Sequence, residues 1–229
     1  MRTVLLIRHG AVAGDAAHCF IGHTDLPMSA EGEAQIRRLA PRLGERMTPD
    51  VFYCSDLVRS RRTAELLLGG RAIPLRIQPE LREINLGAWE GRSRCDVAEQ
   101  QPAEYEQRGC DIENFRPPGG ESFADLAIRI LDFWQSLIAE HTEGTIGIAA
   151  HAGVNRVILC HVLGMPLRDL FRIAQRPGCL NIIEWDRQLP AFDPSVLRLA
   201  GAVSRMSGES GRRTARKSVK CGGLDEAYG

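Results

Sequence analysis

The sequence lacks long hydrophobic runs, an excess of either charge, and the cysteine and histidine patterns of metal sites. Its N-terminal apolar run, residues 4–7, is short, whereas a membrane-spanning helix needs about 20 residues and a signal-peptide core about 7–15. We therefore expect a cytoplasmic protein with no membrane partner. Lys plus Arg number 29, and Asp plus Glu also number 29, so the net charge does not favour nucleic acid as a partner.

The seven cysteines are scattered along the chain and form no C-x-x-C pair. An odd number leaves at least one cysteine unpaired, which is typical of reduced thiols in a reducing compartment. The six histidines include no H-E-x-x-H motif and no zinc-finger spacing with cysteine. We therefore expect no metal and no cofactor.

Short apolar strands alternate with helices along the sequence. Hydrophobic residues make up 44% and charged residues 25% of the 229 residues, which suits one medium-sized globular domain. Strands are predicted at 4–7, 51–54, 75–77 and 145–150, with late strands at 179–185 and 196–199. The alternation predicts an α/β fold, a three-layer α/β/α sandwich with a mostly parallel central sheet. Such sheets bind ligands at the carboxyl ends of their strands.

The C-terminal residues differ from the rest in composition. Residues 204–229 are polar and show no apolar periodicity, which predicts a disordered basic tail after a domain of residues 1–203. A solvated tail is favoured over one that binds RNA or acidic surfaces. The basic cluster of the tail is Arg212, Arg213, Arg216, Lys217 and Lys220.

Three local features give further expectations. Ser55 and Asp56 can cap the helix that follows the second strand. Pro41 is expected to kink or break the first helix, because proline removes a backbone donor. Residues 85–120 are rich in Gly, Pro and polar residues, which predicts an excursion over the sheet edge with a short helix at 97–105. Long inserts of this kind often contact substrate.

Two histidines each follow a buried strand, His9 after the first and His151 after the fourth. In a parallel sheet both emerge at the same edge. One such histidine is more often structural, but Arg8 and Arg59 add positive charge that is costly to bury without an anion. Phosphate matches the fork of an arginine side chain, and the helix after Ser55 is expected to add its amide dipoles. The sequence therefore predicts a phosphate site at this edge.

The segments around these residues resemble the histidine phosphatase superfamily, which includes phosphoglycerate mutases and α-ribazole phosphatases. The matching segments are LIRHG at 6–10, GHTDLPMSAEGEAQ at 22–35, SDLVRSRRTA at 55–64, LREINLGAWEG at 81–91, GGES at 119–122 and AHAGVNR at 150–156. Together they extend over roughly residues 4–165 in the order that the superfamily has.

This resemblance implies a phosphoglycerate mutase-like fold and a phosphoric monoester hydrolase of the histidine acid phosphatase type, without a metal. By position, His9 is the nucleophile that becomes phosphorylated, and Glu83 is the acid that gives a proton to the leaving oxygen. His151 is a further catalytic residue. The residues that the resemblance assigns to phosphate binding are Arg8, Arg59, His151 and Gly22.

The match departs from the superfamily pattern at three positions. Many members have Asn where Asp15 stands, Thr or Ser where Ile21 stands, and Gly where Ala152 stands. A carboxylate near phosphate would repel it, so Asp15 is expected to point away or to contact polar groups of the substrate. Ala152 puts in question how closely a backbone N–H approaches the ligand.

Several residues also have plainer interpretations. Without the other motifs, Glu83 would be interpreted as a surface carboxylate in a charged turn with Arg82. Arg62 is expected to be solvated or salt-bridged, and Trp89 to pack in the core or under a lid. His23 is the remaining histidine of most interest, because it lies beside the expected phosphate-binding segment.

Other functions stay open at this level. Mutases of the superfamily resemble one another in having a longer insert between the proton-donating acid, Glu83 here, and the GGES segment. The shorter insert of this sequence favours hydrolysis over mutase chemistry. A catalytically silent phospho-ligand binding module would not need both a nucleophile and an acid. FIGHTDLP at 20–27 and GCLN at 178–181 are similar to the α-ribazole phosphatase branch, which suggests α-ribazole 5′-phosphate and cobalamin biosynthesis. The expected partner is a small-molecule phosphate ester, and a homodimer stays open.

Overall fold

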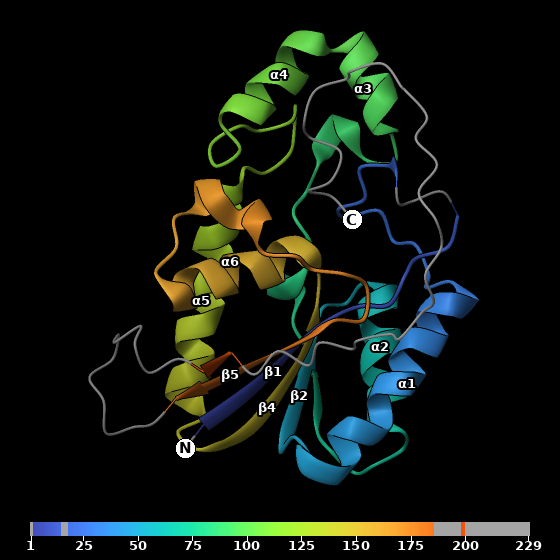
Figure 1. Ribbon diagram of the computed structural model, residues 1–229, viewed down its shortest axis with the longest axis vertical. Helices are drawn as coiled ribbons and strands as arrows, with labels where there is room; N and C mark the ends of the chain where they lie inside the picture. Colours follow the sequence, from blue (N-terminus) through green and yellow to red (C-terminus); the bar gives the residue numbers. More distant parts are fainter. Residues whose placement is uncertain (1, 15–17, 186–197, 200–229) are drawn as a thin grey trace, which may run out of the picture.

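The computed structural model describes residues 2–14, 18–185 and 198–199, which form a six-stranded sheet with helices on both faces (Figure 1). The strands are β1 (Arg2–Arg8), β2 (Val51–Cys54), β3 (Leu75–Ile77), β4 (Gly144–Ala150), β5 (Leu180–Trp185) and β6 (Arg198–Leu199). The α-helices are α1 (Ala30–Arg46), α2 (Val58–Leu68), α3 (Arg94–Gln100), α4 (Pro102–Cys110), α5 (Phe123–Glu140) and α6 (Ala152–Leu163). The 3₁₀ helices include η2 (Pro79–Leu81), η3 (Gly87–Trp89) and η4 (Leu167–Arg172). The predicted three-layer α/β/α fold is confirmed.

The strands lie in the order β3-β2-β4-β1-β5-β6. β1, β2, β3 and β4 are mutually parallel, whereas β5 runs antiparallel to β1 and β6 antiparallel to β5. The sheet is therefore mostly parallel, as predicted, with an antiparallel edge. The two late strands predicted by the sequence correspond to β5 and β6, although part of the second predicted range lies outside the described residues.

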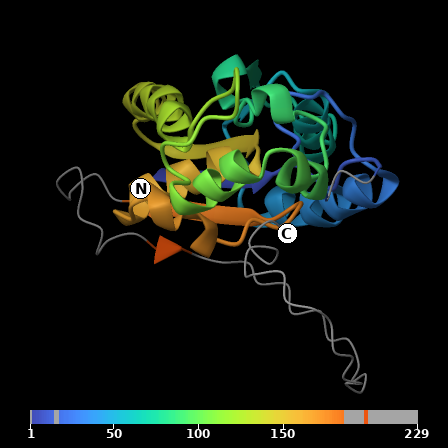
Figure 2. The same cartoon turned by 90° about the horizontal axis from the view of Figure 1, so that it is seen from above.

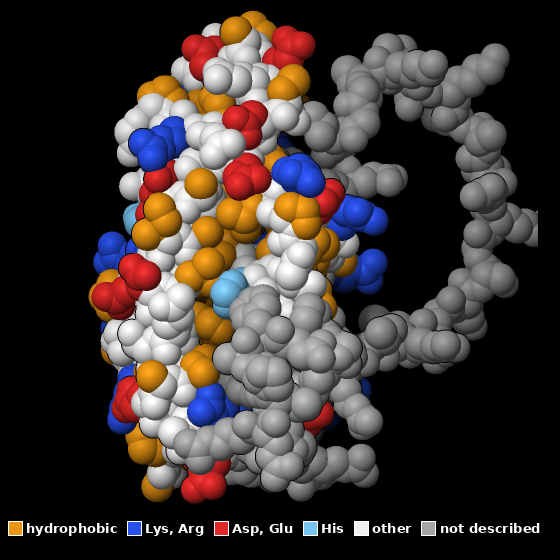
Figure 3. Space-filling model, turned by 90° about the vertical axis from the view of Figure 1, so that its left-hand side faces the viewer, with side chains coloured by type: hydrophobic (Ala, Val, Ile, Leu, Met, Phe, Trp, Pro, Cys, Tyr) orange, Lys and Arg blue, Asp and Glu red, His pale blue; other side chains and the backbone are white. Residues whose placement is uncertain are grey.

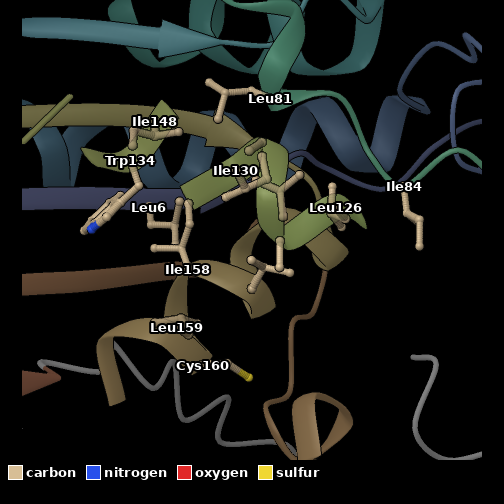
Figure 4. Close-up of a cluster of buried hydrophobic side chains, with 14 of the residues drawn as sticks. Leu6, Leu81, Ile84, Leu126, Ile130, Trp134, Ile148, Ile158, Leu159 and Cys160 are labelled. Atoms are coloured by element: carbon tan, nitrogen blue, oxygen red, sulfur yellow. The ribbon is translucent and has the colours of Figure 1, made fainter. Parts of the chain in front are cut away.

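Alternate side chains of β1 enter different cores on the two faces of the sheet. Leu6 packs with Ile130 and Trp134 of α5 and with Ile158 of α6 (Figure 4). Leu5, the residue before Leu6, belongs to a second core on the other face of the sheet, which α1 and α2 cover. The view from above shows the helices on opposite sides of the sheet (Figure 2). Because both faces of β1 are buried, its position is fixed from both sides.

The helix α1 runs through Pro41 without ending there, so the expected break is wrong. Ser29 caps this helix by accepting a hydrogen bond from the amide of Gly32 at 3.0 Å. Ile36 and Leu43 are buried against the sheet on one face of the helix. Burial of this apolar face offsets the backbone hydrogen bond that proline cannot make.

Ser55 and Asp56 do not cap α2, which corrects another expectation. The N-cap residue is Leu57, whose side chain makes no capping bond. The carboxylate of Asp25 accepts instead from the amide of Val58 at 2.8 Å. Asp56 pairs with the guanidinium of Arg82, with an Oδ1 to Nε distance of 2.7 Å. The cap thus comes from a segment distant in sequence.

The excursion between β3 and α5 contains two α-helices, α3 and α4, where one short helix was expected at 97–105. Ser93 caps α3 by accepting from the amide of Asp96 at 3.0 Å. Pro102 then occupies the first turn of α4, a position in which proline's missing donor has no cost. The expected helix therefore overlaps two helices that meet at Gln101.

The two ends of this excursion are joined in a narrow neck. The amide of Ala88 donates to the carbonyl of Pro118 at 2.9 Å, and the amide of Glu121 donates to the carbonyl of Asn85 at 2.8 Å. Gly87 has a φ of 53°, and a Cβ there would lie 2.3 Å from the oxygen of Pro118. Only glycine permits this close approach. The helices α3 and α4 thus form a closed unit above the carboxyl ends of the strands (Figure 1).

The described surface carries both signs of charge. On the face shown in Figure 3, acidic and basic side chains are interspersed with hydrophobic ones. Over the described ranges, no helix combines the length and apolar character needed to cross a membrane. The predicted basic tail and Asp15 lie outside those ranges.

The contact between Gly147 and Phe52 provides a test of the packing. A Cβ on Gly147 would lie 2.3 Å from the ring of Phe52, which is fully buried. We expect Gly147→Ala to lower the free energy of unfolding by about 1–3 kcal/mol, because the core must shift to admit a methyl group. Urea unfolding measures this loss. In the double variant, Phe52→Leu should remove part of the clash with the added methyl group. If the double variant lost as much free energy of unfolding as the two single variants together, this packing would be contradicted.

Candidate active site

The ends of β1 and β4 bring His9 and His151 together. The strands are parallel, with Arg8 opposite Ala150, and the amide of His9 donates to the carbonyl of Ala150 at 3.0 Å. The ring centroids of the two histidines lie 5.1 Å apart. The sequence prediction that both histidines reach one edge of the sheet is therefore met in the structure.

The ring of His9 is held in one orientation. Its Nδ1 lies 2.7 Å from the carbonyl oxygen of Gly10, which can only accept, so Nδ1 carries the proton. In the neutral ring, Nε2 then carries the lone pair. Burial, followed by the charges of Arg8 and Arg59, holds the pKa of His9 well below its ordinary value. His9 is therefore a neutral base with a free nitrogen lone pair at neutral pH.

His151 lies deeper than His9 and is fully buried. Its Nε2 is 2.8 Å from the hydroxyl oxygen of Ser55 at the end of β2. Burial, followed by the charge of Arg59, holds the pKa of His151 well below its ordinary value. If Ser55 donates to Nε2, the proton of the neutral ring lies on Nδ1, which has no partner among the described residues. Ser55, expected to be a helix cap, thus orients a histidine.

Two arginines stand beside the histidines and are held by backbone carbonyls. Arg59 is 1% exposed and donates to the carbonyls of Thr24 at 2.7 Å and Gly22 at 2.6 Å. Arg8 donates to the carbonyl of Gln175. Burial lowers the pKa of both guanidinium groups. Each arginine is fixed by neutral acceptors and keeps its charge.

Glu90 organises the segment that holds Arg59, a role that the sequence did not reveal. Its carboxylate accepts from the amides of Gly22, His23 and Thr24 at 2.7–3.1 Å and from the hydroxyl of Thr24 at 2.5 Å. These bonds turn the carbonyls of Gly22 and Thr24 toward Arg59. The matching segment at 81–91 contained Glu90, but a carboxylate whose partners are backbone amides and one distant hydroxyl leaves no pattern of its own.

Glu83 is 8% exposed, so the interpretation as a surface carboxylate is wrong. Its two oxygens accept from the amide of Gly153 at 3.1 Å each, and Oε1 accepts from the amide of Ile84 at 2.9 Å. A Cβ on Gly153 would lie 2.3 Å from Oε1. Gly153 therefore both admits and binds this carboxylate at the start of α6.

The remaining sequence-predicted residues lie outside the reacting centre. The amide of Gly22 is bound by Glu90 and its carbonyl by Arg59, so Gly22 supports Arg59 rather than facing the cavity. Arg62 pairs with Glu33 at 2.7 Å, and Trp89 is fully buried. Both match the plainer interpretation. The first amide of α2, expected to face phosphate, is taken by Asp25.

A cavity of about 360 Å³ opens at this edge of the sheet. His9, Arg8, Arg59 and Glu83 line one part of it, whereas His151 does not line it. Its other walls include five further residues that the sequence did not single out for the site: Phe20, Arg94, Arg108, Phe123 and Phe171. Within the part of the chain that the structure describes, no group of three or more His, Cys, Asp or Glu side chains could hold a metal ion.

Comparisons with known proteins agree on one family. The profile of the histidine phosphatase superfamily (branch 1) matches residues 4–194. The adenosylcobalamin/alpha-ribazole phosphatase of Salmonella typhimurium is 33% identical over 180 residues, 78% of this chain and 88% of that protein. The metal-independent phosphoserine phosphatase of Arabidopsis thaliana is 30% identical over 165 residues, 69% of this chain and 68% of that protein. The crystal structure of the alpha-ribazole phosphatase from Shigella flexneri superposes with a TM-score of 0.78 at 28% identity, covering 91% of this chain and 100% of that one.

The lowered pKa values of His9 and His151 can be measured directly. Both rings should stay neutral as the pH falls through about 6.5, the ordinary value for histidine. In Arg59→Gln, the pKa of both should rise, because a nearby positive charge is removed. Nitrogen-15 NMR of the imidazole rings across pH 4–8 distinguishes the outcomes. Ordinary titration of both rings in the unmodified protein would contradict the described burial.

Proposed function

The chain belongs to the histidine phosphatase superfamily, and from this membership we propose that it hydrolyses small phosphate monoesters through a phosphohistidine on His9. The observation that carries the proposal is the contact of 2.7 Å between Nδ1 of His9 and the carbonyl oxygen of Gly10, beside Arg8 and Arg59. Because a carbonyl oxygen can only accept, this contact assigns the ring proton to Nδ1 and the lone pair to Nε2. A nucleophile that needs no deprotonation is thus next to two groups that bind phosphate oxygens.

In the first step, Nε2 of His9 attacks phosphorus and the bond to the ester oxygen breaks. Arg8 and Arg59, which line the cavity, are proposed to bind the phosphoryl oxygens and to offset their charge. His151, which lies behind the cavity wall, is proposed to join them through its Nδ1, the ring nitrogen that Ser55 does not contact. Glu83, in its protonated form, gives its proton to the departing alcohol. The amide of Gly153 holds this carboxyl group at the start of α6, on the cavity wall that it shares with His9.

In the second step, water attacks the phosphohistidine. The Glu83 carboxylate takes the proton from this water, the phosphorus–nitrogen bond breaks, and phosphate leaves. His9 regains its lone pair and Glu83 its proton, so the cycle closes without a further reactant. Arg8 and Arg59 supply the charge stabilisation that a metal ion gives other phosphatases.

α-Ribazole 5′-phosphate is the first named substrate that we propose to test. The support comes from the relatives in Salmonella typhimurium and Shigella flexneri that carry this activity in their names. Another relative, the probable phosphoglycerate mutase of Erwinia tasmaniensis, is 26% identical over 206 residues, 90% of this chain and 95% of that protein. Isomerisation of 3-phosphoglycerate that depends on bisphosphoglycerate would identify a mutase instead.

The cytoplasm is the proposed compartment. The six described cysteines are all free thiols, which suits a reducing environment. A small phosphate ester is the proposed partner, and light scattering distinguishes a monomer from a homodimer.

The nucleophile and the absence of a metal requirement can be tested together. We expect the protein to hydrolyse p-nitrophenyl phosphate at an unchanged rate in EDTA and to form an acid-labile phosphoenzyme. His9→Ala should abolish hydrolysis and labelling together, because it removes the attacking nitrogen. Loss of activity in EDTA, restored by a divalent metal, would overturn the proposed chemistry. Arg62→Gln, which alters a salt-bridged surface arginine, is the matched control and should leave both signals unchanged.

The role of Glu83 can be tested with leaving groups of different basicity. Glu83→Gln should lower the hydrolysis of alkyl phosphates by about 100-fold or more. It should largely spare p-nitrophenyl phosphate, whose phenolate leaves without a proton. Rapid-quench trapping of the phosphoenzyme separates its formation from its breakdown. Slow phosphoenzyme formation with both kinds of substrate would mean that another residue is the acid.

A further inference from the structure

Glu83, the proposed acid, lies on a stretch of chain between two short helices. The 3₁₀ helix η2 ends at Leu81 and η3 begins at Gly87, so Glu83 belongs to neither a helix nor a strand of the described chain. The amides of Gly153 and Ile84 hold its carboxylate. A general acid must lie within hydrogen-bond reach of the leaving oxygen. The groups that fix the main chain at Glu83 therefore bear on the reaction.

Arg129 of α5 binds this stretch through its backbone carbonyls. Nη1 of Arg129 donates to the carbonyls of Glu80 and Arg82, the latter at 3.0 Å. Nη2 lies 3.4 Å from the carbonyl oxygen of Glu83 itself. Because a guanidinium carries its donors in one rigid plane, a single side chain holds these three carbonyls at fixed relative positions.

Glu121 binds both Arg129 and the chain that follows the acid. Its Oε1 accepts from Nε of Arg129 at 3.1 Å, and its Oε2 accepts from Nη2 at 2.8 Å. Oε2 also accepts from the amide of Asn85 at 2.9 Å. The amide of Glu121 donates in return to the carbonyl of Asn85 at 2.8 Å. Arg129 and Glu121 thus bind the chain both before and after Glu83.

This ion pair rests on a rigid helix and lies outside the cavity. Leu126 and Ile130, on the same helix as Arg129, are fully buried, and α5 begins with a capping box. The side chains of Arg129 and Glu121 are about one-fifth exposed, at 22% and 23%. Neither residue lines the cavity of the reacting centre. Any effect of the pair on the reaction must therefore pass through another residue.

We infer that Arg129, together with Glu121, is a positioning residue that fixes the main chain at 80–85 so that Glu83 faces the leaving oxygen. The inference rests on the proposed phosphohydrolase function and extends it to residues outside the cavity. All side-chain bonds from this pair to main-chain groups of the described chain fall on residues 80–85. Displacing a reacting group by about 1 Å can lower a rate by about a hundredfold.

Substrates that differ in their need for an acid test the inference. Arg129→Met keeps a long side chain but removes its donors, so Glu83 is free to move. By rapid-quench measurement, phosphoenzyme formation from glycerol 1-phosphate should slow by about tenfold to a hundredfold. Formation from p-nitrophenyl phosphate, whose phenolate leaves without a proton, should change by less than about threefold. Arg129→Lys keeps the charge but loses the fork, so its effect should be intermediate.

A double-variant cycle tests whether Arg129 acts through the acid. In Glu83→Gln no acid remains to be positioned, so adding Arg129→Met should slow formation from glycerol 1-phosphate by less than about threefold further. Losses that multiply would place the action of Arg129 elsewhere and overturn the inference. Glu121→Ala removes the carboxylate that binds Arg129 and Asn85. It should show the same selective loss, which keeps the test decisive if Arg129→Met does not fold.

A matched control removes another ion pair of the same helix. Arg76→Met breaks the pair with Glu140 of α5 and should leave formation from both substrates unchanged. If Arg129→Met slows both substrates equally, or neither, the pair serves stability alone, and the inference is wrong while the phosphatase stands. If the unmodified protein hydrolyses neither ester, the proposed function is wrong and the inference falls with it. Urea unfolding of each variant verifies that the rates come from folded protein.

Discussion

The parallel hydrogen bonds between β1 and β4, continued by the amide of His9 onto Ala150, bring two histidines from distant parts of the chain to one point. β2 flanks β4 on its other side, so Ser55 emerges where it can orient His151. The remaining groups are placed relative to this edge. The helix α6 begins directly after His151, and its amide at Gly153 holds Glu83.

Arg59 and Arg8 are held without losing their charge. A carboxylate bound directly to Arg59 would compete with phosphate for the same fork. Instead, Arg59 donates to the backbone carbonyls of Thr24 and Gly22, and the carboxylate of Glu90 binds the amides of the same segment. The negative charge thus organises the peptide segment, while the guanidinium keeps its attraction for an anion. The same principle applies to Arg8 and the carbonyl of Gln175.

The sequence predicted the sheet and its two histidines because both are encoded locally. A short apolar run followed by a histidine indicates a strand that ends in a polar residue. Because the two strands are parallel, both histidines then lie at the same edge of the sheet. The cap of α2 by Asp25 and the contact of Ser55 with His151 depend on which distant segments meet. Local patterns do not contain that information, so capping was assigned to the nearest suitable residues.

The same limit explains which parts of the site were missed. Glu90 binds the hydroxyl of one distant residue, Thr24, and otherwise backbone amides, which every residue except proline possesses. These partners have no sequence signature. Arg108 and Phe171 meet only because α4 folds back over the cavity. The residues that the sequence did predict lie in segments that resemble the histidine phosphatase superfamily. The resemblance assigned five of them to one site: Arg8, His9, Arg59, Glu83 and His151.

The neck formed by Asn85, Glu121, Ala88 and Pro118 has a consequence for how such proteins diverge. Because the two ends of the excursion are already joined to each other, the chain between them can lengthen or shorten without displacing the strands below. Selection can then rebuild the roof of the cavity, including Arg94 and Arg108, while the histidines and their supports stay in place. Insertions and deletions confined to this excursion can in this way change the substrate while the hydrolytic centre stays the same.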